Sequence, residues 1–196
     1  MIPTVINPMG ISLYGRRLQY IASTGTQYIN TGVKPDFANG DSVEMNFYGA
    51  TFSGAAPCAF GSRETGVKNG IYCLGLANSV IVCDNSGNST FGFTTETQDI
   101  TIIVDDSNIT VNGESVQMPR RVTCGLPIFL FALNNYGMGT YGIYPGMRLY
   151  SWKYWHNGTL AQHLVPVLDR SGVPCMYDTV TRTLKYNAGT GTFNYE

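Results

Sequence analysis

The chain has 196 residues, a net charge of −1 and 43% hydrophobic residues, enough apolar material for one domain with a sizeable core. Charged residues make up 13% of it, about half the ~25% usual for soluble domains. Adjacent cationic residues occur only at Arg16-Arg17 and Arg120-Arg121, whereas nucleic-acid binding needs several cationic phosphate contacts. No apolar run approaches the ~20 residues that a membrane span requires. We therefore expect neither a nucleic-acid partner nor membrane insertion.

Residues 1–17 precede the first clear strand pattern and contain Pro3 and Pro8. We expect this segment to be an N-terminal arm. It is either a leading strand that lies on the domain or an anchor that docks on a neighbouring subunit or on a capsid or tail surface. The segment lacks a basic region followed by an unbroken apolar stretch, so no secretory signal is predicted. Residues 18–196 then form a single domain.

Short extended runs separated by turn residues follow from Leu18 onward. Residues 18–23 and 28–33 flank a Thr-Gly-Thr turn, and Ser42–Tyr48 alternates apolar and polar residues as a half-buried strand does. Further strands are expected at residues 59–62, 70–76, 79–83, 99–104, 108–111, 116–118 and 128–133. The last is a continuous apolar run, as expected for a central core strand. Turns every 8–12 residues and the absence of helical periodicity predict an all-β sandwich or barrel.

The C-terminal third begins with a predicted β-hairpin. Two extended runs lie on either side of His156-Asn157-Gly158, and Asn-Gly readily adopts the positive φ angles of a tight primed turn. Asn112-Gly113 is a second turn of this kind. Alternation along the first run of the hairpin predicts that Tyr150, Trp152 and Tyr154 share one face of the strand.

Two stretches resemble a known family. The stretch NGTL…LVPVLD…G…MYDTVTRTLKYNAGTGTF, within residues 157–193, resembles the closing motif of laminin-G-like, concanavalin A-like domains. The stretch LQYIASTGTQYINTGVKP, residues 18–35, resembles their opening strand pair, and FGSR (60–63) and IFLFALNNYG (128–137) are also similar. Such domains occur in phage structural proteins and in surface proteins of gut bacteria. The resemblance implies a two-sheet antiparallel jelly roll whose first and last strands lie side by side.

The cysteines favour no metal site. They are odd in number and lack C-x-x-C spacing, so zinc is not expected. They are Cys58, Cys73, Cys83, Cys124 and Cys175. Buried thiols are the preferred interpretation, with a Cys73–Cys83 cross-link between neighbouring strands as the alternative.

Calcium is a weak candidate, and no other cofactor is expected. Laminin-G-like domains sometimes hold calcium at the rim of the sandwich, and the loop at residues 84–90 carries suitable oxygens at Asp84, Asn85 and Asn88. The register of a recognised calcium loop is missing, so a plain polar turn is the preferred interpretation.

The sequence does not favour an enzyme. Glycosidases of concanavalin A-like fold need two carboxylates in one cleft, which on one strand requires acids at i and i+2 or i+4. None of the thirteen acidic residues forms such a pair, and no G-x-S-x-G nucleophile motif is present. His156 lies in the Asn-Gly turn, where a solvated side chain is expected. His163 lies on a strand, where a local hydrogen bond is the usual role.

Glycan binding is the function that the residue pattern favours. Sugars present apolar C–H faces ringed by hydroxyls, so their sites combine aromatic rings with amide or arginine side chains. The Gly- and Tyr-rich loop at residues 134–144 has both features, and exposed aromatic residues in a loop usually contact something. The candidate glycan-binding residues are Arg63, Asn134, Asn135, Tyr136, Tyr141 and Tyr144. For each aromatic residue taken singly, packing in the core is the preferred interpretation and a ligand platform the alternative, and Arg63 could instead form a surface ion pair with Glu64.

The resemblance, the lack of a predicted export signal and the N-terminal arm together indicate a bacteriophage virion protein. We expect a non-catalytic head fibre, decoration or tail-associated protein, assembled in the host cytoplasm, whose lectin-like domain contacts host or mucosal glycans. Its other partners would be capsid or tail proteins, through the arm, and further copies in a homo-oligomer. The alternatives are a purely structural virion module and a carbohydrate-binding domain of a secreted bacterial surface protein, located outside the cell or on its surface.

Overall fold

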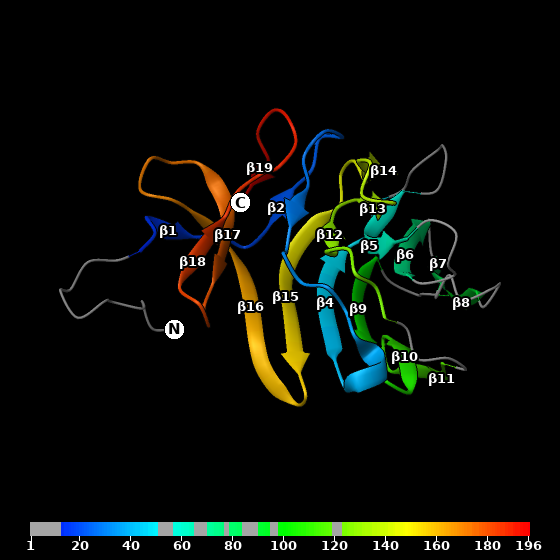
Figure 1. Ribbon diagram of the computed structural model, residues 1–196. Coiled ribbons are helices and arrows are strands. Elements are labelled where there is room, and N and C mark those ends of the chain that lie inside the picture. The colour runs from blue at the N-terminus through cyan, green and yellow to red at the C-terminus, as the bar shows by residue number, and fades with distance from the viewer. Residues whose placement is uncertain are drawn as a thin grey trace.

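The computed structural model describes seven parts of the chain. These are residues 13–50, 57–64, 70–76, 79–83, 90–94, 98–118 and 123–196. Within these ranges the chain is all-β, with one short 3-10 helix, η1 (Phe37–Asn39). Two sheets pack against each other around a shared core, so the expected β-sandwich is confirmed (Figure 1).

The larger sheet has the strand order β11-β10-β9-β4-β15-β16-β17-β18, with β1, β2 and β19 paired alongside it. Its strands are β1 (Arg16–Arg17), β2 (Ile21–Ala22), β4 (Ser42–Tyr48), β9 (Asp99–Val104), β10 (Asn108–Val111), β11 (Glu114–Gln117), β15 (Arg148–His156), β16 (Thr159–Leu168), β17 (Pro174–Asp178), β18 (Thr183–Lys185) and β19 (Asn194–Tyr195).

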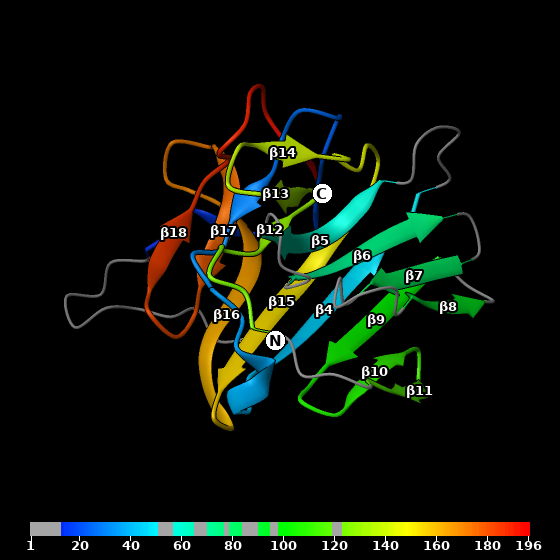
Figure 2. The same ribbon diagram turned by 45° about the vertical axis from the view of Figure 1, so that its right-hand side comes forward.

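The smaller sheet has the order β14-β13-β5-β6-β7-β8, with β12 and β3 paired at its side. Its strands are β3 (Ile29–Asn30), β5 (Cys58–Arg63), β6 (Gly70–Leu76), β7 (Ser79–Cys83), β8 (Thr90–Thr94), β12 (Phe129–Leu130), β13 (Leu133–Asn135) and β14 (Thr140–Tyr141). Figure 2 shows β5 to β8 side by side in front of the larger sheet.

The core lies between the two sheets. In β4, Val43, Met45 and Phe47 are fully buried and alternate with half-buried polar residues, which confirms the predicted half-buried strand. The Trp152 ring of the larger sheet lies 5.6 Å from the Phe60 ring of the smaller one. Burial of each such side chain contributes roughly 1.5–3 kcal/mol to stability, so these contacts hold the sheets together. The four cysteines whose side chains are described are also buried, as expected: Cys58, Cys73, Cys124 and Cys175.

The predicted Asn-Gly hairpins are present. Asn157 and Gly158 have φ angles of 48° and 74° between β15 and β16. Asn112 and Gly113 have φ angles of 48° and 88° between β10 and β11. Two successive positive φ angles define the primed turn that suits the twist of paired strands.

The prediction of one continuous core strand at residues 128–133 is wrong. Phe131 has a φ angle of +69° and interrupts the run. The run therefore forms β12, antiparallel to β5, and the first residue of β13, parallel to β5. An apolar run predicts burial, and both β12 and Leu133 are indeed buried. It does not predict where the backbone turns.

The prediction that Tyr150, Trp152 and Tyr154 share one face of the strand is also wrong, because Tyr150 lies on the other face. The pairing of β15 with β4 shifts register between Leu149 and Ser151, and both Leu149 and Trp152 point into the core. This bulge turns Tyr150 to the outer face, where its ring meets Tyr20 edge-on and its hydroxyl reaches Asp99.

The early strand β2 lies between β15 and the last strand, β19. Adjacent early and late strands are what the resemblance to laminin-G-like domains leads one to expect. The opening strand pair is not a hairpin, however, because β3 joins β12 in the smaller sheet. The jelly-roll connectivity itself stays a prediction.

Part of the expected N-terminal arm is described, from Leu13 to Arg17. β1 pairs with β16, and Leu13 and Tyr14 pack on a second apolar cluster on the outer face of the larger sheet. The Tyr14 ring lies 5.0 Å from that of Tyr177. These residues behave as the leading-strand interpretation predicts. Residues 1–12 lie outside the described ranges, and the anchoring role of the arm stays a prediction.

Candidate functional site

Four of the six predicted glycan-binding residues meet at one end of the smaller sheet. Arg63 is the last residue of β5. Strand β13 runs parallel to β5 and places Asn135 directly beside Arg63. The hairpin from β13 to β14 then brings Tyr136 and Tyr141 to the same place. Figure 2 shows β13, β14 and β5 together at this end of the sandwich.

The Arg63 guanidinium is the centre of this group. Its Cζ atom lies 4.8 Å from the ring centroid of Tyr136, 5.6 Å from that of Tyr72 and 5.9 Å from that of Tyr141. Cations within about 6 Å of an aromatic centroid are attracted by the ring quadrupole. The Nε atom also donates a hydrogen bond of 2.7 Å to the side-chain oxygen of Asn135. We call Arg63, Tyr72, Asn135, Tyr136 and Tyr141 the Arg63 cluster.

A strained turn places Tyr136 over the guanidinium. The amide of Met138 donates to the carbonyl of Asn135 at 3.1 Å, and Tyr136 and Gly137 have φ angles of 61° and 70°. This is the geometry of a type I′ turn, whose first central position favours Asn, Asp or Gly. The amide of Tyr136 also donates to the carbonyl of Arg63 at 2.9 Å. A tyrosine in the left-handed region costs conformational energy, and such outliers concentrate at functional sites.

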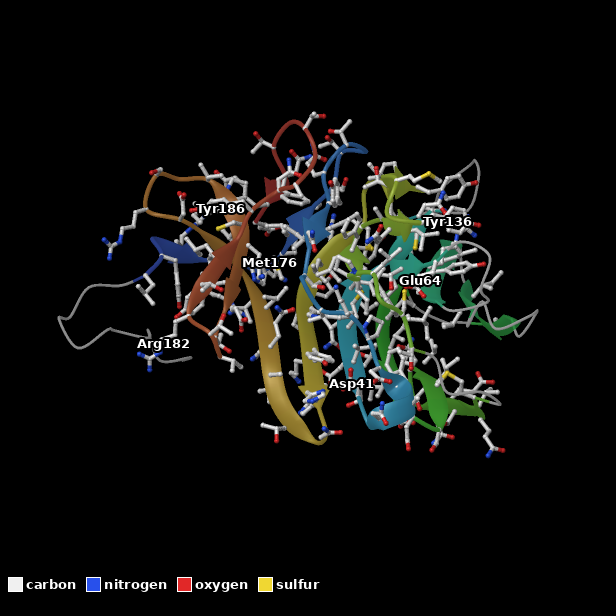
Figure 3. The ribbon with its side chains drawn as sticks, in the orientation of Figure 1. Asp41, Glu64, Tyr136, Met176, Arg182 and Tyr186 are labelled. Carbon is white, nitrogen blue, oxygen red and sulfur yellow. The ribbon has the colours of Figure 1, made fainter. Side chains whose placement is uncertain are left out.

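The cluster presents apolar surface to solvent. Tyr141 is 52% exposed and Met138, at the tip of the same hairpin, is 79% exposed. Figure 3 shows Tyr136 at one extremity of the sandwich, away from the core. An exposed ring beside a positioned cation is a surface that an amphipathic ligand can cover.

Gly61 makes room for Tyr72. Gly61 pairs with Tyr72 across β5 and β6, and a Cβ atom at position 61 would lie 2.4 Å from the Cβ of Tyr72. Such a contact is far too short, so only glycine fits here without a shift of the strands. Ile71 and Cys73 on either side are fully buried, which leaves Tyr72 on the outer face beside Arg63.

The predicted glycan-binding role is wrong for Tyr144 and Asn134, because both side chains are buried. Tyr144 is fully buried, its hydroxyl donates to the carbonyl of Ala50 at 2.8 Å, and burial raises its pKa. Asn134 is 3% exposed, and its amide donates to the carbonyl of Pro127 at 2.9 Å. Successive residues of a strand point to opposite faces, so Asn134 and Asn135 cannot both line one surface.

Tyr72 is the member of the cluster that the sequence prediction missed. It lies on a different strand from the Gly- and Tyr-rich loop, and only the register of β5 with β6 brings it to Arg63. Its neighbours gave a usable signal. Alternation along residues 70–76 predicts that Tyr72 points away from the side that buries Ile71 and Cys73.

A second polar group lies at the opposite end of the sandwich, around Asp41 (Figure 3). Asp41 is 1% exposed and accepts hydrogen bonds of 2.8 Å from His156 Nδ1, the Tyr154 hydroxyl and the Asp36 amide. The His156 side chain is 58% exposed, so it is solvated as expected, but the buried carboxylate beside it was not predicted. Burial is the largest cause that raises the pKa of Tyr154, and its hydrogen bond to Asp41 adds to it.

The described residues contain no group of three or more His, Cys, Asp or Glu side chains placed to hold a metal ion. The calcium candidates Asp84, Asn85 and Asn88 lie outside the described ranges. In the part of the chain that the structure describes, no helix is long and apolar enough to cross a membrane.

Comparison with known protein families and with curated proteins finds no match for this chain. The resemblance to laminin-G-like, concanavalin A-like domains therefore stays a prediction from the sequence, and the site must be interpreted from its own chemistry.

Proposed function

We propose that this protein is a non-catalytic, lectin-like module that binds a sugar through the Arg63 cluster. The observation that carries the proposal is a group of side chains gathered around the Arg63 guanidinium, with Tyr141 52% exposed. Arg63 comes from β5, Asn135 from β13, Tyr136 from the turn after it and Tyr141 from β14. A pyranose ring can stack its C–H face on Tyr141 while its hydroxyls accept from the guanidinium and exchange hydrogen bonds with Asn135.

The strain in the turn supports a binding role over a structural one. A hairpin that only connected β13 to β14 would be more stable with Asn or Gly in place of Tyr136. The tyrosine at that position places an aromatic ring 4.8 Å from the Arg63 Cζ atom. The same hairpin exposes Met138 and Tyr141, so its apolar side chains are directed outward instead of into the core.

We further propose that the module acts on the surface of a bacteriophage virion, with the jelly-roll connectivity of concanavalin A-like domains. This setting rests on the sequence resemblance and on the N-terminal arm. The purely structural alternative is supported by the second apolar cluster, where Leu13 and Tyr14 cover Val165, Val167, Cys175 and Tyr177, because such a contact can also be made between subunits.

A glycan array with the purified chain tests the sugar-binding proposal, with Tyr141→Ala as the diagnostic variant. Tyr195, 43% exposed on β19 of the other sheet, offers a matched control as Tyr195→Ala. We expect binding to a defined sugar, weakened about two- to tenfold by Tyr141→Ala and unchanged by Tyr195→Ala. Silence across the array from a folded chain would overturn the proposal in favour of the structural module.

A further inference from the structure

We propose that the sugar bound by the Arg63 cluster is acidic, and that its carboxylate forms a paired hydrogen bond with the Arg63 guanidinium. The inference rests on the proposed function and names the ligand class of the same site: a uronic acid or a sialic acid. Three observations carry it.

The first is the state of the guanidinium. Asn135 occupies the Nε atom at 2.7 Å and so fixes the plane of the group. The two terminal nitrogens have no hydrogen-bond acceptor among the described residues. A guanidinium presents parallel N–H donors in a rigid fork that matches the two oxygens of a carboxylate. Within the described part of the chain, the cluster thus holds an oriented fork whose terminal N–H groups have no acceptor.

The second is the charge around it. The neighbouring carboxylate, Glu64, accepts the amide of Gly125 at 3.0 Å, which directs it to another partner. Within the described residues, no carboxylate is hydrogen-bonded to Tyr136 or Tyr141. Among the described residues, the Arg63 guanidinium therefore has no hydrogen-bonded carboxylate, and an anionic ligand can pair with it.

Arg148 shows what a compensated site of similar composition looks like in this protein. Its Cζ atom lies 4.8 Å from the Tyr20 ring and 5.0 Å from the Tyr48 ring, on the larger sheet. There the Tyr20 hydroxyl donates to Glu196 at 3.1 Å, and the Tyr150 hydroxyl donates to Asp99 at 3.1 Å. Both carboxylates lie among the tyrosines that surround this arginine, whereas Tyr136 and Tyr141 beside Arg63 have no such carboxylate partner among the described residues.

The third is the juxtaposition of cation and exposed ring. The Arg63 Cζ atom and the Tyr141 centroid are 5.9 Å apart, within the span of one monosaccharide. In a uronic or sialic acid the carboxylate is attached directly to a ring carbon. One sugar residue can therefore stack on Tyr141 and place its carboxylate on Arg63 at the same time.

Calorimetric titration with methyl glucuronide, methyl galacturonide and N-acetylneuraminic acid tests the inference, each compared with its neutral methyl ester. We expect at least one acid to bind tenfold or more tightly than its ester. Arg63→Gln should abolish that preference. Arg63→Lys should lose most of it, because an ammonium keeps the charge but not the fork. The matched control Arg148→Gln should keep the preference, and thermal melting of each variant checks folding.

The outcomes separate the two proposals. Equal binding of acids and esters, still weakened by Tyr141→Ala, would overturn the acidic ligand and leave sugar binding intact. An acid preference that Arg148→Gln removes as fully as Arg63→Gln would also overturn it. If Arg63→Gln does not fold, Tyr141→Phe is titrated instead with each acid and its methyl ester. This variant should keep the preference for the acid. Loss of that preference would count against the contact between the carboxylate and Arg63. Failure of every sugar to bind a folded chain would overturn both proposals.

Discussion

The buried carboxylate of Asp41 lies 2.8 Å from the ring nitrogen Nδ1 of the exposed His156. The same carboxylate accepts from the Tyr154 hydroxyl and the Asp36 amide, so it joins the turn of the β15–β16 hairpin to the segment around η1. Hydrogen-bonding groups buried together in this way are costly to remove singly, since each leaves the others without partners.

Asp41→Asn should therefore destabilise the protein by about 1–3 kcal/mol, because an amide cannot accept from three donors as a carboxylate does. Urea unfolding followed by tyrosine and tryptophan fluorescence measures the change. Glu114→Gln, at an exposed position on β11, is the matched control and should be neutral. His156→Gln should cost less than Asp41→Asn because His156 is more than half exposed. Equal stability of Asp41→Asn and the parent chain would contradict the prediction.

Replacements of Tyr136 should invert the usual ranking of alanine and glycine. In an ordinary strand glycine is less stable than alanine, but Tyr136 has a φ angle of 61°, which alanine tolerates poorly. We expect Tyr136→Gly to be more stable than Tyr136→Ala by about 1 kcal/mol. Both variants remove the ring, so sugar binding should weaken in both. Chemical unfolding gives the first quantity and titration the second. A more stable alanine variant would mean that the turn is not of the primed type.

Gly61→Ala tests the support beneath the site. The added methyl group would meet the Tyr72 Cβ at 2.4 Å and the Ile71 carbonyl oxygen at 2.8 Å, so β5 and β6 must shift. We expect a loss of about 1–3 kcal/mol in stability, together with weaker sugar binding as Tyr72 and Arg63 move. Gly92→Ala is the control in the same sheet, since nothing lies within 4 Å of its Cβ position. If both alanine variants unfold at the same urea concentration, Gly61 is not needed for close approach.

Acid should weaken the fold through Asp169. Its pKa is lowered chiefly by the backbone hydrogen bond from Val173, with Tyr186 and Ser171 adding to the effect. A carboxyl group whose pKa is lower in the folded state binds its proton more readily in the unfolded state. Its contribution to stability is therefore complete above the unfolded pKa, about 3.9, and is lost as the pH falls through the folded pKa.

Asp169→Asn should accordingly flatten the decline in unfolding free energy below about pH 4, while lowering stability at neutral pH. Urea unfolding at a series of pH values between about 2 and 7 measures this. Glu114→Gln should leave the acid decline as steep as in the parent chain. An unchanged slope in Asp169→Asn would show that other carboxylates govern acid stability.

Local chemistry predicted the alternation in β4 and both Asn-Gly turns, because side-chain period and turn preference depend on a few neighbouring residues. It failed at Phe131, where an apolar run says nothing about a reversal of the backbone. It also failed to separate Asn134 from Asn135, since a shift of one residue exchanges the faces of a strand.

The sequence prediction missed Tyr72, a member of the Arg63 cluster, for a different reason. Asn135 was predicted from its own loop, and Arg63 from a motif, although they lie 72 positions apart. Tyr72 belonged to neither stretch. Only the pairing of β5 with both β6 and β13 unites the three, and long-range pairings of this kind are not encoded in any short window of sequence.

The position of β2 between β15 and β19 also constrains how the protein is made. Ile21 and Ala22 leave the ribosome well before their partners in β15 and β19, which lie much further along the chain. During synthesis this early segment has no strand to pair with, and its buried side chains stay exposed to other nascent chains. Completion of the larger sheet must therefore follow translation of β19, which favours slow closure of the fold.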